Sequence, residues 1–208
     1  MASVSARTPL TRSRIVATAI GIARAEGIAA ASMRRIADEL GSAPMALYRH
    51  IADREALLLA MLDDVAATIE VPEPVEDPVA ELTAILMKVH ARFRRDPWIV
   101  TVLVVDGLAS PLILPVIERC FAALERAGLR GRDIAAAHAL IWQYVYGESI
   151  SMMHDRPDSF ARQMSRGADD AYPVLGAVRA GLGPTDPRDF FAENLPRLLR
   201  GIVGAGHA

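Results

Sequence analysis

The stretch SMRRIADELGSAPMALYRHIADREALL, residues 32–58, contains two short helical patterns separated by a three-residue turn. Ser32 can cap the first helix, and Gly41 suits the position just past its end. Pro44 suits the first position of the next helix, because the N–H that proline lacks would have no partner there. Two short helices joined by a three-residue, glycine-containing turn predict a helix-turn-helix.

The second of these helices has one apolar face and several polar or small ones. Leu47 and Ile51 are four positions apart, so they share the inward face. The other faces carry small, apolar or cationic residues: Pro44, Met45, Ala46, Tyr48, Arg49 and His50. A helix that enters a major groove needs this mixture of close approach, apolar contact with thymine and donors for phosphate. Arg34 and Arg35 add donors nearby, while the alternative is an ordinary solvated surface.

Helical signals continue on both sides of the motif. Thr11 can cap a helix that runs to about Glu26, and Asp53 can cap one that runs to about Glu70. The stretch VPEPVEDP, residues 71–78, then predicts a stiff break, since it holds three prolines and three acidic residues. Six further helices are predicted, the fifth with a break, over residues 78–95, 98–108, 111–127, 132–154, 158–181 and 187–204.

These elements predict an all-α protein with an N-terminal three-helix DNA-binding domain and a larger helical domain. The expected organisation is a helix-turn-helix domain with an N-terminal arm over residues 1–53, a connecting helix over 54–70, the break at 71–78, and a helical domain over 79–208.

Composition sets further limits. The chain has 208 residues, and its 52% hydrophobic content excludes a disordered protein. The net charge of −2 excludes a wholly basic coat, but residues 1–55 carry eight arginines and five acidic residues, which gives this part a net charge of +3. A basic N-terminal part on an acidic body can still bind a polyanion with one face.

Several features predict a soluble protein of the cytoplasm. The single cysteine, Cys120, cannot form an internal disulfide, and the N-terminus lacks the apolar segment of a signal peptide. The apolar stretch at residues 98–117 is interrupted by Asp106, Gly107 and two prolines, so buried helices are expected there and no membrane partner.

The stretch from Thr11 to Leu62 closely resembles the DNA-binding part of the tetracycline-repressor (TetR) family, on the residues IADELG and MALYRHIADREALL. The resemblance implies a homodimeric transcription factor, usually a repressor, that binds a near-palindromic double-stranded operator and releases it when a small, largely apolar effector binds the helical body. In this resemblance Arg34 matches a position that reaches a base edge, and Pro44, Met45 and Ala46 match groove contacts. Tyr48, His50 and Arg54 match phosphate contacts, and Ser32 is a cap that can also donate to phosphate.

The body offers only candidates for the effector and the dimer interface. The aromatic, histidine and methionine residues of the central helices are the effector candidates: His90, Trp98, Phe121, His138, Trp142, Tyr146, Met152 and Met153. The last helix carries an apolar stripe for the dimer interface that the resemblance implies: Phe191, Leu195, Leu198 and Ile202. Packing within one chain is the alternative for both sets, and Pro196 should kink the last helix or start a new one.

The sequence contains no motif that indicates catalysis, a cofactor or a metal site. The stretch GESIS at residues 147–151 is not a nucleophile elbow, and no phosphate loop, dinucleotide fingerprint or zinc spacing occurs. We therefore expect no enzyme activity, no cofactor and no metal site. The alternatives left open are an activator of the same family and a helical dimer that binds a partner without recognising an operator.

Overall fold

The computed structural model describes residues 9–152, 171–182 and 190–205, and all regular secondary structure in these residues is helical, without a strand. This confirms the predicted all-α class. The chain forms two compact units: unit 1 comprises Met1–Val71 and Arg95–Ile117, and unit 2 comprises Pro72–Arg94 and Glu118–Ala208. Residues 95–117, which the sequence analysis placed in the second domain, thus belong to the same compact unit as the helix-turn-helix.

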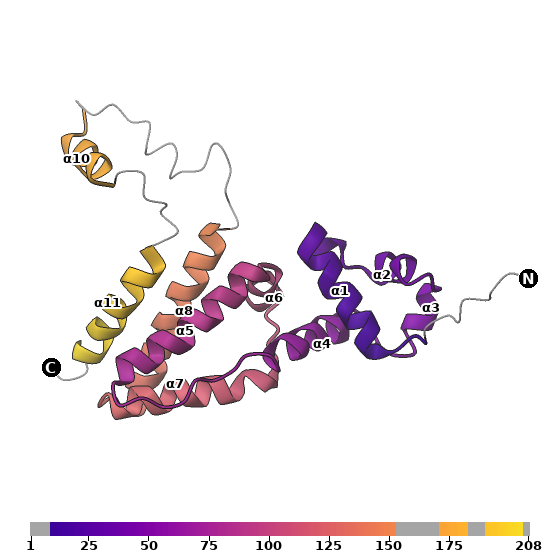
Figure 1. Ribbon diagram of the computed structural model, residues 1–208, viewed down its shortest axis with the longest axis horizontal. Helices are drawn as coiled ribbons and strands as arrows, with labels where there is room; N and C mark the ends of the chain where they lie inside the picture. The colour runs from indigo at the N-terminus through magenta and orange to yellow at the C-terminus, as the bar shows by residue number, and fades with distance from the viewer. Residues whose placement is uncertain (1–8, 153–170, 183–189, 206–208) are drawn as a thin grey trace, which may run out of the picture. The chain divides into compact units, whose positions relative to one another are not determined.

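Unit 1 begins with the helix-turn-helix and its supporting helices (Figure 1). Its elements are α1 (Arg12–Glu26), the 3-10 turn η1 (Ile28–Ala30), α2 (Met33–Glu39), α3 (Pro44–Leu47), α4 (Arg54–Ala66), α6 (Trp98–Val104) and the 3-10 turn η2 (Pro111–Ile113). All three predicted side-chain caps are present, because Thr11, Ser32 and Asp53 each accept a hydrogen bond from the backbone N–H three residues later.

The turn of the motif follows its sequence closely. Gly41 has a φ of +60°, a conformation that glycine adopts without strain, and the Ser42 N–H bonds to the Ala37 carbonyl at 2.9 Å. Helix α3 is shorter than the predicted pattern, because it ends at Leu47. Its N-cap residue, Ala43, has no side chain that could accept a capping hydrogen bond. Leu47 and Ile51 are nevertheless both buried, as predicted.

Two predicted helices of unit 1 also end early. Helix α4 stops at Ala66, four residues before the predicted end at Glu70. Helix α6 stops at Val104, and Gly107 then takes a φ of +67°, which breaks the helical path. The apolar stretch 98–117 is therefore divided among α6, η2 and the start of α7, and within the described residues no helix has the length and apolar content to cross a membrane.

Within its described residues, unit 2 contains four long helices and a shorter one (Figure 1). They are α5 (Pro78–Arg95), α7 (Leu114–Arg126), α8 (Arg132–Met152), α10 (Pro173–Leu182) and α11 (Phe190–Ala205). Aromatic contacts join α5 to α8 and to α11, and α7 to α8. A single helix spans Pro196, which excludes a new start at this proline and leaves a kink as the expectation.

Candidate nucleic-acid interface and effector site

Helix α3 presents one buried face and one open face. Leu47 is fully buried, whereas Met45 is 75% exposed and Tyr48 is 45% exposed. Pro44, Arg49 and His50 are exposed as well, and Ala46 is half-buried. The residues predicted to contact DNA therefore share the surface of one short segment, which consists of α3 and the turn at residues 48–50 that follows it.

The four arginines proposed for DNA contacts fall into two pairs. Arg34 and Arg49 are exposed and form no ion pair with any residue that the structure describes. Arg35 donates to Glu39 at 2.7 Å and to Glu26 at 2.8 Å, and these hydrogen bonds raise its pKa, that to Glu39 most. This leaves Arg34 and Arg49 with free donor groups.

Arg54 is occupied by backbone groups of the same unit. Its guanidinium donates to the carbonyl oxygens of Ala31 at 3.3 Å and Ile28 at 3.5 Å, at the ends of η1. Ser32 accepts its cap bond from Arg35 N–H at 3.2 Å, which leaves the hydroxyl hydrogen available to an outside acceptor. The DNA contacts themselves stay predictions for all these residues.

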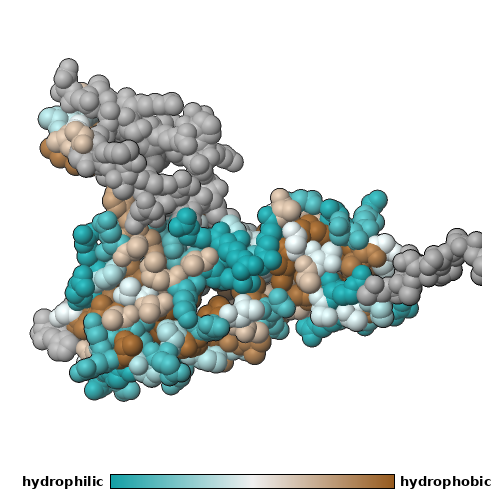
Figure 2. All heavy atoms as spheres, in the orientation of Figure 1, coloured by the Kyte–Doolittle hydropathy of each residue, from teal (hydrophilic) through white to brown (hydrophobic). Residues whose placement is uncertain are grey.

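The side of unit 1 that is visible in the space-filling view mixes hydrophilic, neutral and hydrophobic residues (Figure 2). Such a mixture is compatible with DNA binding, in which donors meet phosphates and base edges while apolar side chains meet thymine methyl groups.

In unit 2, four aromatic residues and a histidine from three helices form a connected cluster. Phe93 of α5 lies 6.1 Å from Tyr146 and 6.4 Å from Trp142 between ring centroids, and Trp142 lies 5.3 Å from Tyr146. Phe121 of α7 meets His138 edge to face at 4.9 Å. We call Phe93, Phe121, His138, Trp142 and Tyr146 the aromatic cluster.

A hydrogen bond inside the aromatic cluster fixes the protonation of its histidine. The indole Nε1–H of Trp142 donates to Nε2 of His138 at 2.6 Å, so Nε2 carries no proton. Burial also lowers the pKa of His138, which favours the neutral ring. The proton of the neutral imidazole must then be on Nδ1, and His138 offers one N–H donor from an otherwise aromatic surface.

A second group of rings joins α5, α8 and α11. Phe191 stacks on His90 with centroids 3.7 Å apart, and Tyr144 stacks on Phe191 at 5.4 Å. His90 is buried, and its Nε2 has no hydrogen-bond partner among the described residues. Burial, with a smaller contribution from the charge of Arg94, lowers the pKa of His90.

The structure thus brings together half of the predicted effector residues: Phe121, His138, Trp142 and Tyr146. His90 belongs to the second group, and Trp98 lies in unit 1, where its indole donates to Asp96 at 3.3 Å. The Met152 side chain and Met153 lie outside the described residues. Sequence reasoning missed Phe93, although it is three positions after His90 on the same helix.

The stripe predicted for the dimer interface divides in the same way. Phe191 and Leu195 are 1% and 0% exposed within the single chain, so they belong to its own core, which was the alternative interpretation. Leu198 and Ile202 are half-buried, and their place in a dimer interface stays a prediction. Among the described residues no three His, Cys, Asp or Glu side chains gather as a metal site would require.

Comparisons with known proteins match both parts of the chain. Residues 15–61 match the family of bacterial regulatory proteins called tetR, and residues 72–204 match the tetracyclin repressor-like C-terminal domain. The HTH-type transcriptional repressor DrrR1 of Streptomyces coeruleorubidus is 34% identical, and the match covers 93% of this chain and 77% of the relative.

Solved structures of similar fold include ActR from Streptomyces coelicolor. The ligand-free form is 27% identical, with a TM-score of 0.80, and the match covers 96% of this chain and 97% of ActR. The complex of ActR with actinorhodin, also 27% identical, has a TM-score of 0.79, and the match covers 96% of this chain and all of that chain, 100%.

Proposed function

Because this chain belongs to the TetR family of bacterial transcriptional regulators, we propose that it is a homodimeric repressor that a small aromatic effector releases from its operator. The open surface of α3 and the turn after it, where Met45 is 75% exposed and Tyr48 and Arg49 are exposed as well, is the observation that carries the DNA-binding part of the proposal. The curated relative DrrR1, a repressor, supports repression over activation.

Each protomer would place α3 in a major groove, so the operator should be a near-palindrome with half-sites about one helical turn apart, or a multiple of it. Arg34 would read a base edge, with about 1–3 kcal/mol of discrimination, and Met45 would contact a thymine methyl group. Tyr48, Arg49 and His50 would bind phosphates and supply affinity without much specificity. Operator binding of this kind would take place on cytoplasmic DNA and would need no catalytic step.

The aromatic cluster supports the choice of effector. ActR, a relative in fold, has been solved with actinorhodin, and flat aromatic molecules suit contacts with rings such as Trp142, Tyr146 and Phe121. The Nδ1–H of His138 would then bind a carbonyl or hydroxyl oxygen of the effector. The effector would favour the conformation that does not fit the operator, and operator DNA must in turn weaken effector binding by the same factor.

A partner-binding dimer without operator recognition is the alternative. It would leave the exposed Met45 and the unpaired Arg34 and Arg49 without a use, so the surface of unit 1 argues against it.

The decisive experiment is selection of bound duplexes from a random DNA pool by the purified protein, followed by a salt titration on the selected sequence. We expect an enriched near-palindrome and a steep fall of affinity with salt, because phosphate contacts release counterions. Binding without any enriched sequence would overturn operator recognition. The Arg34→Ala variant, selected in the same way, should lose preference at one base pair in each half-site.

A further inference from the structure

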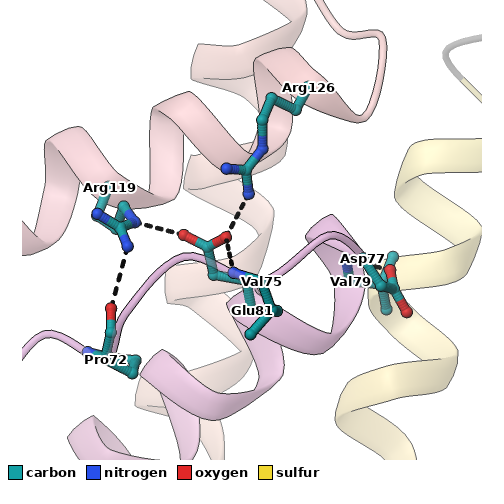
Figure 3. A network of polar contacts seen from close by, with 7 residues as sticks. All are labelled: Pro72, Val75, Asp77, Val79, Glu81, Arg119 and Arg126. Atoms are coloured by element: carbon teal, nitrogen blue, oxygen red, sulfur yellow. Dashed lines mark hydrogen bonds and ion pairs between the residues drawn. The ribbon is translucent and has the colours of Figure 1, made fainter.

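A buried carboxylate organises the start of unit 2 (Figure 3). Glu81, in the first turn of α5, is buried, and its two oxygens accept hydrogen bonds from Arg119 and Arg126 of α7. The N–H of Val75 also donates to Glu81, at 3.3 Å. The three charged side chains therefore hold α5 and α7 together with the segment that precedes α5.

Arg119 makes one further bond that Arg126 does not. Its Nη2 donates to the carbonyl oxygen of Pro72 at 3.1 Å, while its Nε donates to Glu81 (Figure 3). Because guanidinium donors form a rigid fork, the two bonds fix the position of Pro72 relative to Glu81.

The two ends of this link have a special place in the chain. Pro72 is the first residue of unit 2 after unit 1 ends at Val71, and Arg119 is the second residue after the chain leaves unit 1 again at Ile117. The chain passes between the units at three places, and Arg119 ties two of them together inside unit 2. Any shift of α7 at Arg119 must therefore move both connections at once.

Stability alone does not account for the network. Burial opposes the charge of Glu81 and raises its pKa, but the hydrogen bonds from Arg119 and Arg126 outweigh burial and hold the pKa below its ordinary value. A well-packed apolar replacement of such a cluster is often as stable as the ions. What the ions add is a defined geometry, since each donor meets a particular oxygen.

Helix α7 also leads to the aromatic cluster. Phe121 is two positions after Arg119 and touches His138 of α8 edge to face at 4.9 Å. A ligand that displaces Phe121 would act on the same turn of helix that holds both connections.

We propose that Arg119, held in place by Glu81, is a positioning residue that fixes both of these connections and thereby sets which operator half-site spacing the dimer accepts. This inference rests on the proposed function, because it assumes two recognition helices on one operator. Arg119 acts through the backbone of Pro72 and touches no DNA.

The test compares Arg119→Met with Arg126→Met. Both variants remove one cation from Glu81, but only the first breaks the bond to Pro72. Each is assayed for operator affinity on the selected duplex and on duplexes with one base pair added or removed between the half-sites. We expect Arg119→Met to lose at least tenfold of the wild-type preference for the selected spacing, and Arg126→Met to keep that preference even where its thermal stability falls.

A third variant guards against a failure to fold. Glu81→Leu, Arg119→Met and Arg126→Met together remove all three charges, so no uncompensated ion stays buried. The triple variant should fold and show the same loss of spacing preference as Arg119→Met. Equal spacing preference in the wild type, Arg119→Met and the triple variant would overturn the inference while leaving operator binding intact.

Hydrogen exchange separates this failure from a failure of the proposed function. The backbone of residues 73–77 should exchange faster in Arg119→Met than in Arg126→Met, with or without DNA. If the wild type selected no operator, the proposed function would be rejected. Independently of that result, equal exchange rates of residues 73–77 in the two variants would reject Arg119 as the anchor of Pro72.

Discussion

Arg24, in the last turn of α1, donates hydrogen bonds to both carboxylate oxygens of Asp96, which lies 72 positions later and just before α6. The Asp96 side chain is fully buried, and the hydrogen bond to it is the main reason why the pKa of Arg24 is raised. Ser110 makes a comparable link, because its hydroxyl donates to Asp63 of α4 at 2.6 Å. Residues 95–117 are thus bonded to the helix-turn-helix part at two points.

The Arg24–Asp96 pair predicts an asymmetric response to mutation. Arg24→Met leaves a buried carboxylate without its cation and should cost stability near the lower end of about 3–5 kcal/mol, since Arg24 itself is 38% exposed. Asp96→Asn should cost less, because the guanidinium can turn toward water. Urea unfolding measures both, with Arg197→Met as a control, since its pair with Glu193 is exposed and long at 3.7 Å. Equal losses for Arg24→Met and Asp96→Asn would contradict this reasoning.

The two neighbouring arginines of α2 should differ in their effect on DNA binding. Arg34 is exposed without an ion pair among the described residues, whereas Arg35 is held by Glu39 and Glu26. Arg34→Ala should therefore weaken binding to the selected operator by about 1–3 kcal/mol and reduce the preference for one base pair in each half-site. Arg35→Ala should change the affinity much less. Fluorescence anisotropy on the operator and its single-base variants measures both effects. A larger loss for Arg35→Ala would show that its pairs open on binding.

Buried histidines make stability depend on pH in a defined direction. The pKa of His90 is lowered by burial, so between an unfolded value of about 6.5 and the lower folded value only the unfolded chain takes up the proton. The free energy of unfolding should be flat with respect to His90 above pH about 7.5 and should fall as the pH drops through about 6.5. His90→Phe keeps a ring against Phe191 and should flatten this fall. Denaturant unfolding at a series of pH values tests it, and parallel profiles for wild type and variant would reject the assignment.

The only cysteine should be unreactive in the folded protein. Burial, and after it the charge of Glu81, raises the pKa of Cys120 to about 12, so the thiolate is scarce at neutral pH. A thiol-specific chromogenic disulfide at pH 8 should therefore label the native protein at a small fraction of the rate seen in urea. Rapid stoichiometric labelling of the native protein would mean that the interior around α7 opens readily.

Local chemistry explains what the sequence could predict. The caps at Thr11, Ser32 and Asp53 depend on residues only three positions apart, and all three are found. The inward face of Leu47 and Ile51 follows from helical periodicity and is also found. Interactions of this range leave their signature in a single sequence.

Long-range pairing leaves no such signature. Glu81 meets Arg119 and Arg126 from 38 and 45 positions away, and nothing in the sequence distinguishes these arginines from solvated ones. Phe191 shows another limit, because the same apolar spacing serves a dimer interface and the chain's own core. Arg35 is a mixed case: its partner Glu39 lies four positions on in the same helix, a spacing that the sequence shows, whereas Glu26 comes from another helix. Both carboxylates occupy donors that the sequence analysis left free for phosphate.

Unit 1 consists of two separate stretches of chain, which matters for the construction of chimeric regulators by exchange of the N-terminal DNA-binding part, here called the head. A cut between the two family matches, after residue 63 and before residue 72, would transplant Arg24 and Asp63 without Asp96 and Ser110. The grafted head would then face a foreign α6 segment whose side chains were never matched to it. A junction that carries residues 95–117 along with the head preserves both bonds, so the natural module for such exchanges is made of two separate pieces of chain.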